Sequence, residues 1–235
     1  MPPKKSATSE QEFKAFLDGW LARQEHYLDE LLTAIQNCHE SCDDDRNDLI
    51  SRVLNHYQEY WEEKSRVSQS NIFLVCFPPW FSCFEHTFLW IGGFKPGLAL
   101  RVLQDSVDDL SDHLRQQVSR LTQETRRQEK MLDEELARIQ ESMASPPFLQ
   151  QLKRRGLRDG EVKSAEEEAL ARLRYEMAAL LGRANSLRVN TVSGIVETLN
   201  PTQNVRFLTE VTQLQLKVRN WGVERDAERE GSSSG

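Results

Sequence analysis

The densest group of potential metal ligands in the chain is the stretch Cys38-His39-Glu40-Ser41-Cys42. Thiolate, imidazole and carboxylate groups are all zinc ligands, but a structural zinc site needs four of them, usually as two closely spaced pairs. The remaining cysteines, Cys76 and Cys83, lie in an apolar segment broken by prolines and do not supply the second pair. We therefore predict no metal site here and expect two ordinary thiols near a helix end.

Acid–base chemistry has three candidates, His56, His86 and the neighbouring Glu85. No motif places a serine or cysteine nucleophile with them, as covalent catalysis requires. Gly92-Gly93 with Lys95 matches neither the phosphate loop nor the dinucleotide-binding glycine pattern. The sequence thus predicts that the protein is not an enzyme, and it indicates no cofactor.

Glu85 has a structural explanation. Ser82-Cys83-Phe84-Glu85 matches the S-x-x-E capping box, in which the two side chains satisfy backbone N–H groups at a helix start. The pattern predicts a short helix over 83–91, ended by Gly92. A further helix begins at Pro96, because proline is favourable at the first helical position.

The short helix predicted over 83–91 lies in the most apolar part of the chain, Asn71 to Phe94, which carries eight aromatic residues. Its length approaches the roughly 20 residues of a membrane span, but Pro78-Pro79 and Glu85 oppose that interpretation. We predict instead a broken pair of short helices buried in a core. Core packing is the simplest explanation of the aromatics. The alternative is an apolar ligand pocket lined by Trp80, Phe84, Phe88 and Trp90.

The rest of the chain shows apolar residues three and four positions apart, as in amphipathic helices. Capping boxes at Ser9/Glu12 and Ser164/Glu167, and caps at Ser111 and Asn200, mark helix starts. Gly182 and Gly194 fall inside one helix, and one of them is expected at a close helix contact. The predicted helices cover 9–37, 46–68, 111–143, 164–199 and 201–221.

The fold class predicted is all-α, a bundle of long amphipathic helices around the short aromatic broken-helix core. We predict one domain over 9–222 with a mobile loop at about 144–163, a disordered arm over 1–8 and a disordered tail over 223–235. The formal charge is −7, without a basic block, which disfavours direct DNA binding. No signal peptide or membrane span is evident, so we expect reduced thiols and a nuclear or cytoplasmic location.

Three segments together carry a family resemblance: HYQEYWEEKSRV (56–67), PPWFSCFEHTFLWIGGFKP (78–96) and LRVNTVSGIVETLNPTQNVRFLTEV (187–211). They resemble the DOG domain, named for the plant Delay of Germination regulator and also present as the C-terminal half of the TGA bZIP transcription factors. The family signature is the block Trp90, Ile91, Gly92, Gly93, Phe94 and Lys95.

The resemblance implies an all-helical plant regulator whose partners are signalling phosphatases or transcriptional coactivators. The dormancy regulator also binds haem through two histidines four residues apart, but those positions here are Gln215 and Arg219, so no haem site is predicted. The relative's phosphatase-contact segment corresponds to Ala15, Phe16 and Leu17, which differ from it in type.

The leading hypothesis is a non-enzymatic regulator that acts through protein contacts in seed dormancy, abscisic acid-type signalling or transcriptional control. One alternative is a sensor of a small apolar ligand such as a fatty acyl chain. Another is a developmental scaffold, as in pollen-wall patterning. The long predicted helix over 111–143 also favours a homodimer.

Overall fold

The computed structural model describes residues 4–37, 42–143 and 159–232; for residues 4–9, 159–166, 230 and 232 it describes the backbone alone. Within these ranges the chain is helical and contains no strand, which confirms the predicted all-α fold. The helices are α1 (Lys4–Gln36), α2 (Asp43–Ser70), α3 (Ile72–Cys76), α4 (Cys83–His86), α5 (Gly97–Ser106), α6 (Asp112–Met143), α8 (Asp159–Thr198) and α9 (Pro201–Ser232). No helix among them is long and apolar enough to cross a membrane.

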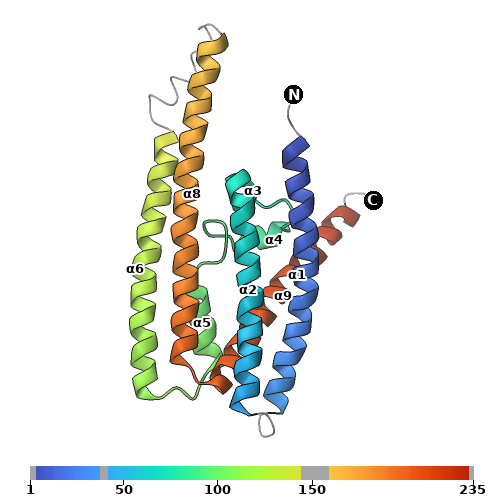
Figure 1. The fold of residues 1–235 in the computed structure, drawn as a ribbon, viewed down its shortest axis with the longest axis vertical. Coiled ribbons are helices and arrows are strands. Elements are labelled where there is room, and N and C mark those ends of the chain that lie inside the picture. Colours follow the sequence, from blue (N-terminus) through green and yellow to red (C-terminus); the bar gives the residue numbers. More distant parts are fainter. Residues whose placement is uncertain (1–3, 38–41, 144–158, 233–235) are drawn as a thin grey trace.

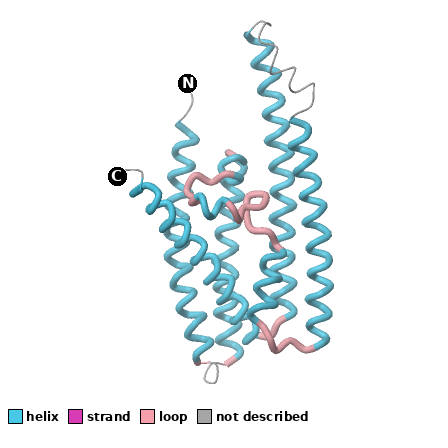
Figure 2. The backbone as a smooth tube through the Cα atoms, turned by 180° about the vertical axis from the view of Figure 1, so that it is seen from behind, coloured by secondary structure: helices cyan, strands magenta, loops and turns pink. Residues whose placement is uncertain are grey.

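The long helices form two antiparallel pairs, α1 with α2 and α6 with α8 (Figure 1). The short helix α5 lies between these pairs, α3 follows α2 and contacts α8, and α4 lies against α9. Seen from behind, α9 runs diagonally across the molecule and covers the pair α1–α2 (Figure 2). It contacts α1, α2, α4 and α5, so the last helix connects segments from the whole first half of the chain.

The apolar core has three parts. The largest surrounds α5, where Leu100 and Leu103 are almost fully buried against α2, α8 and α9. A second part packs the N-terminal half of α1 against α3, and a third lies between α6 and α8. Burying each such side chain stabilises the fold by about 1.5–3 kcal/mol. The predicted break of this segment into short helices is confirmed, and α3 is buried. Its aromatic residues nevertheless lie outside the fully buried core, and Phe77 and Phe88 are 72% and 47% exposed.

Several helix starts follow the predicted caps. Ser111 Oγ accepts the Leu114 N–H at 3.3 Å at the start of α6. At the start of α9, Asn200 Oδ1 accepts the Gln203 N–H at 2.9 Å, and the Gln203 side chain accepts the Asn200 N–H at 3.2 Å. These local bonds satisfy N–H groups that a helix start would otherwise leave unpaired.

Other predicted boundaries are wrong. Helix α1 begins at Lys4 and α8 at Asp159, so Ser9 and Ser164 lie inside helices and start neither of them. The S-x-x-E pattern is equally compatible with a helix interior, which is why it misled here. Helix α9 continues to Ser232, through most of the predicted disordered tail, and α1 includes part of the predicted disordered arm. Residues 1–3, 144–158 and 233–235 lie outside the described ranges.

Helix α4 is also shorter than predicted, ending at His86 instead of residue 91. After His86 the backbone hydrogen bonds join residues three apart: the Phe88 N–H donates to the Glu85 carbonyl, and the Leu89 N–H to the His86 carbonyl. Such bonds between residues three apart are typical of a helix terminus. The chain then leaves helical geometry before Trp90, so Gly92 is not a helix stop.

Helices α1 and α2 are joined at Trp20, which is fully buried. Its indole Nε1 donates to the His56 carbonyl at 2.8 Å, and its ring stacks on the His56 imidazole with centroids 4.5 Å apart. Both imidazole nitrogens are buried and lack a hydrogen-bond partner. Burial, aided by the nearby charge of Arg23, lowers the pKa of His56 from 6.5 to about 4. His56 is therefore a neutral packing residue, which disfavours the role of catalytic base.

His56 is expected to make the protein less stable as the pH falls from about 6.5 to about 4. In that window the unfolded chain binds a proton at His56 and the folded chain does not, so the free energy of unfolding drops by up to about 3 kcal/mol. Urea denaturation at a series of pH values measures this. In His56→Phe that part of the pH dependence disappears, whereas His113→Phe, at an exposed position, retains it. Identical pH profiles for His56→Phe and the unmodified chain would contradict the assignment.

Candidate functional site

The signature block Trp90–Lys95 forms a tight turn. The Trp90 N–H donates to the Gly93 carbonyl at 2.6 Å, and the Gly93 N–H returns to the Trp90 carbonyl at 3.1 Å. Between them Ile91 has φ 44° and Gly92 has φ 66°. Two successive residues with positive φ are typical of a type I′ turn. A side chain on Gly92 would also come within 2.9 Å of Leu181, so glycine is required both for the turn and for its packing.

Two buried cations hold this turn. Lys64 of α2 donates to the Gly92 carbonyl. Arg188 of α8 donates to the Phe94 carbonyl at 2.7 Å and to the Ile91 carbonyl at 3.0 Å, and it also bonds the Trp90 carbonyl. Their exposed fractions are 4% for Lys64 and 1% for Arg188. The turn therefore connects helices α2 and α8 through its own backbone oxygens.

Backbone carbonyl groups and aromatic rings, rather than carboxylates, surround the charged groups of Lys64 and Arg188. Among the described residues neither Lys64 nor Arg188 is in an ion pair, but the Trp61 ring lies 4.6 Å from Lys64 Nζ and 5.6 Å from Arg188 Cζ. Burial lowers the pKa of Arg188 to about 9 and that of Lys64 well below its usual value. Such cation–π contacts are strongest when desolvated. The arrangement joins the turn to the two helices through hydrogen bonds and cation–π contacts.

The outer side of the turn is fixed to α6. Asp133 accepts the Trp90 indole N–H at 2.6 Å and the Lys95 ammonium at 2.9 Å. One residue beyond Pro96, the Gly97 N–H donates to Glu129 at 2.6 Å. The signature residues thus meet α2, α6 and α8 at one point. Sequence reasoning missed Lys64, Arg188 and Asp133.

A second organised region lies where α4 meets α9. The predicted capping box is confirmed: Glu85 Oε2 accepts the Ser82 N–H at 2.8 Å, and Ser82 Oγ accepts the Glu85 N–H at 3.2 Å. Arg219 of α9 donates to the same carboxylate oxygen and to the Trp80 carbonyl, each at 2.8 Å. Nearby, Asp226 accepts the Cys83 N–H at 3.1 Å. Glu85 is a structural cap and carries an interhelical ion pair.

The two family haem positions both take part in packing between helices. Arg219 makes the ion pair just described, and Gln215 accepts a hydrogen bond from the buried Gln24 of α1 at 3.3 Å. Gln24 also donates to the Tyr57 hydroxyl at 2.5 Å, and that hydroxyl lies 3.2 Å from Thr212 Oγ1. These residues use their polar atoms to join α1, α2 and α9.

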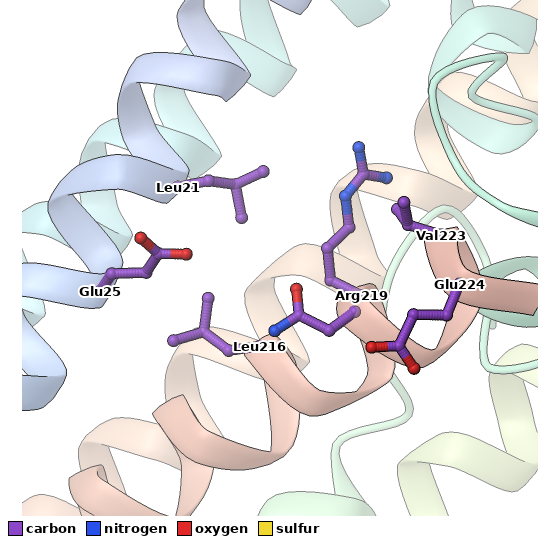
Figure 3. A pocket seen from close by; sticks show the side chains of 7 residues that line it. Leu21, Glu25, Leu216, Arg219, Val223 and Glu224 are labelled. Atoms are coloured by element: carbon purple, nitrogen blue, oxygen red, sulfur yellow. The ribbon is translucent and has the colours of Figure 1, made fainter. Parts of the chain in front are cut away.

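Beside Arg219 a groove of about 330 Å³ opens between α1 and α9. Figure 3 shows Leu21 and Leu216 facing each other, with two carboxylates, Glu25 and Glu224, at the edges. Asn220 and Val223 complete the lining. The groove is apolar in the middle and acidic at its rim, and it holds no set of groups suited to catalysis.

The four aromatics proposed for an apolar pocket point to three different places. Trp80 packs on Phe13 of α1, with ring centroids 4.5 Å apart. Phe84 and Phe88 contact each other at 5.2 Å. Trp90 lies against Arg188 and Asp133 at the signature turn. An apolar pocket formed by these residues remains a prediction.

The remaining chemical candidates are accounted for within the described residues. Cys42 caps α2 by accepting the Asp45 N–H at 3.4 Å, while Cys38, His39, Glu40 and Ser41 lie outside those residues. The His86 ring packs edge-on to Phe81 at 6.1 Å. No cluster of three metal-ligating side chains occurs in the described part of the chain.

The fold and these two regions define an all-helical domain held together around a glycine turn, with no catalytic set among the described residues. The family model described as "DOG1: Seed dormancy control" matches residues 27–105. The chain is 34% identical over 232 residues to Protein RESPONSE TO ABA AND SALT 1 of Arabidopsis thaliana, covering 95% of this chain and 99% of that protein. It is also 34% identical over 221 residues to Protein ZW2 of Arabidopsis thaliana, covering 92% and 98%.

A more distant match is Transcription factor TGA2.3 of Oryza sativa subsp. japonica, 23% identical over 210 residues, which cover 85% of this chain and 60% of that factor. The chain belongs to the DOG1 family and is related to the TGA factors. The resemblance found in the sequence is thereby confirmed. The residues matched by the family model include Lys64 and the whole signature turn.

Replacing Arg188 by methionine is expected to lower the free energy of unfolding by about 2–4 kcal/mol, because buried carbonyl groups of the turn lose their donor. The matched control is Arg183→Met on the same helix, where an exposed arginine pairs with Glu135; that change should cost less than about 1 kcal/mol. Chemical denaturation followed by circular dichroism measures both. Equal losses in the two variants would show that the turn does not depend on Arg188.

Gly222 allows α9 to approach α4 closely, because a Cβ at this position would overlap the Ser82 side chain. Gly222→Ala is expected to lower the free energy of unfolding by about 1–3 kcal/mol through overpacking. Gly182→Ala is the control, since no atom lies within 4 Å of the added Cβ; it should stabilise the helix by about 0.5–1 kcal/mol. Thermal denaturation of both variants tests the opposite signs, and a stabilising Gly222→Ala would refute the close contact.

Proposed function

We propose that this chain is a non-enzymatic plant regulator that acts through protein contacts in an abscisic acid- and salt-responsive process. The observation that carries the proposal is the 34% identity, over nearly the full length of both chains, to a protein named for its response to abscisic acid and salt. The seed-dormancy description of the family model supports the same area of plant physiology. Signalling phosphatases or transcriptional coactivators are the proposed classes of partner, in the nucleus or the cytoplasm.

The site geometry supports a role in binding. The polar groups that sequence reasoning considered for catalysis have structural tasks: Glu85 caps α4 and pairs with Arg219, and His56 is buried without a polar partner. The surface in turn exposes large apolar side chains, among them Phe77, Phe88 and Trp221. Exposed apolar groups on a soluble domain favour contacts with other molecules.

A second candidate function, the sensing of a small apolar ligand, is favoured by the groove between α1 and α9, whose centre is formed by Leu21 and Leu216. Its volume of about 330 Å³ is at the lower end of ligand pockets. Native mass spectrometry of the purified protein separates the two candidates, because a retained ligand appears as added mass that Leu216→Glu abolishes.

Plants lacking this chain are expected to germinate and grow with altered sensitivity to abscisic acid and to salt, and the unmodified chain should restore the normal response. Affinity purification from the same tissue should recover a specific protein partner. Dose–response curves for germination and mass spectrometry of the purified complexes are the measurements. A normal dose–response in the null plants would overturn the assigned process, and recovery of no specific partner would overturn the contact mechanism.

A further inference from the structure

The groove between α1 and α9 has an apolar middle and a carboxylate at each of two edges. Leu216 is buried and Leu21 is half-buried, and both line this groove of about 330 Å³. Figure 3 shows Glu25 of α1 and Glu224 of α9 on opposite sides of these leucines. Both glutamates are exposed, and among the described residues neither is in an ion pair. The groove thus offers two uncompensated negative charges separated by apolar surface.

The α1 side of the groove is acidic beyond its lining. Asp18 lies three residues before the first lining residue of α1, and Asp29 lies four residues after the second, so both aspartates are on the groove side of the helix. Arg23 is paired with a glutamate of α2 at 3.0 Å, and His26 lies 3.3 Å from Glu30 of its own helix. The basic groups of this part of α1 are therefore engaged away from the groove.

On α9 two of the three nearby cations are also engaged elsewhere. Arg219 lines the groove, but its charge is paired with Glu85 at 2.8 Å. The Arg225 guanidinium lies 5.4 Å from the centre of the Phe84 ring, on the side of the helix that faces α4. Lys217 is exposed and in no ion pair among the described residues. Four carboxylates at or beside the groove outnumber this one cation: Asp18, Glu25, Asp29 and Glu224.

We propose that this groove binds an aliphatic diamine of the polyamine class, a methylene chain with an ammonium group at each end. The chain packs on Leu21 and Leu216, where each buried methylene group adds hydrophobic stabilisation. The two ammonium groups pair with Glu25 and Glu224 through charge-assisted hydrogen bonds. The Asn220 side chain supplies a further oxygen acceptor. This inference deepens the second candidate function, the sensing of a small ligand, and rests on it.

Other ligands fit the groove less well. The carboxylate of a fatty acid would lie beside like charges, and a neutral apolar molecule would take water from Glu25 and Glu224 without pairing them. No group of three metal-ligating side chains occurs in the described part of the chain, which disfavours a metal ion. A helix is about 10 Å across with its side chains, so a groove of about 330 Å³ does not enclose one.

The test compares four probes of equal chain length that differ only in their end groups: diaminooctane, octylamine, octanediol and octanoate. Each is titrated into the full chain at fixed ionic strength, and binding is followed by NMR. Diaminooctane is expected to bind about threefold to fivefold more tightly than octylamine, because it pairs with a carboxylate at both ends. Octanediol and octanoate are expected not to bind.

Four variants locate the site. Glu25→Gln and Glu224→Gln should each lower the affinity for diaminooctane to that for octylamine, because one ion pair is lost. Leu21→Ala should weaken binding about threefold, because the methylene chain loses apolar contact. Glu168→Gln is the matched control, since it removes the same charge at an exposed position of α8, and it should leave the affinity unchanged. Circular dichroism confirms that each variant is folded.

Three results would overturn the proposal, because each indicates general attraction of cations to an acidic chain. They are equal affinities for diaminooctane and octylamine, equal weakening by Glu168→Gln and Glu25→Gln, and unchanged binding by Leu21→Ala. Displacement of diaminooctane by an equal concentration of magnesium would overturn it in favour of a metal ion.

The same titrations separate this proposal from the candidate function on which it rests. Binding of octanediol or octanoate that Leu21→Ala weakens would overturn the diamine and support a different small ligand in the groove. If none of the four probes binds, the diamine is excluded, and native mass spectrometry of the purified chain still decides whether another ligand is retained. The leading function, contact with a protein partner, is tested by the null plants and does not depend on these titrations.

Discussion

Lys64 and Arg188 place two positive charges in the interior, and their hydrogen bonds to the backbone of the Trp90–Lys95 turn determine how the bundle is assembled. Removing these charges from water costs several kcal/mol for each ion. Carbonyl dipoles and the face of Trp61 offset that cost, and the positions of the carbonyl groups depend on the turn with positive φ at Ile91 and Gly92. The arrangement therefore fixes α2, the turn and α8 together.

Helix α9 connects the helices that the turn does not reach. The turn joins α2, α6 and α8, but it leaves α1 and α4 to be connected by other means. Gln215, Arg219 and Gly222 do this from successive turns of α9, through Gln24, Glu85 and Ser82 respectively. Gln215 and Arg219, which the family resemblance aligned with haem-binding histidines, here make polar contacts between helices.

Features that depend on residues close together in the sequence could be predicted from it. The caps at Ser82, Ser111 and Asn200 were predictable because each bond joins residues three apart. The shape of the signature turn was not predictable, because it depends on Lys64 and Arg188, which are distant from the turn in the sequence.

A signal for one of these cations, Arg188, was nevertheless present. Arg188 occurs in the apolar series Leu181, Ala184, Leu187 and Ile195, where a charged side chain must find buried partners. The spacing revealed that the position faces the core. It did not reveal that backbone carbonyls would be the partners, since carbonyl positions depend on the turn.

The same reasoning explains why the rim of the groove between α1 and α9 is acidic. Arg219 is the cation nearest the groove, but its charge is paired with Glu85, so Glu25 and Glu224 leave the groove rim acidic. On the side of α9 that faces α4, Asp226 accepts the Cys83 backbone N–H. The internal ion pair and the capping contact thus determine which charges remain for a partner.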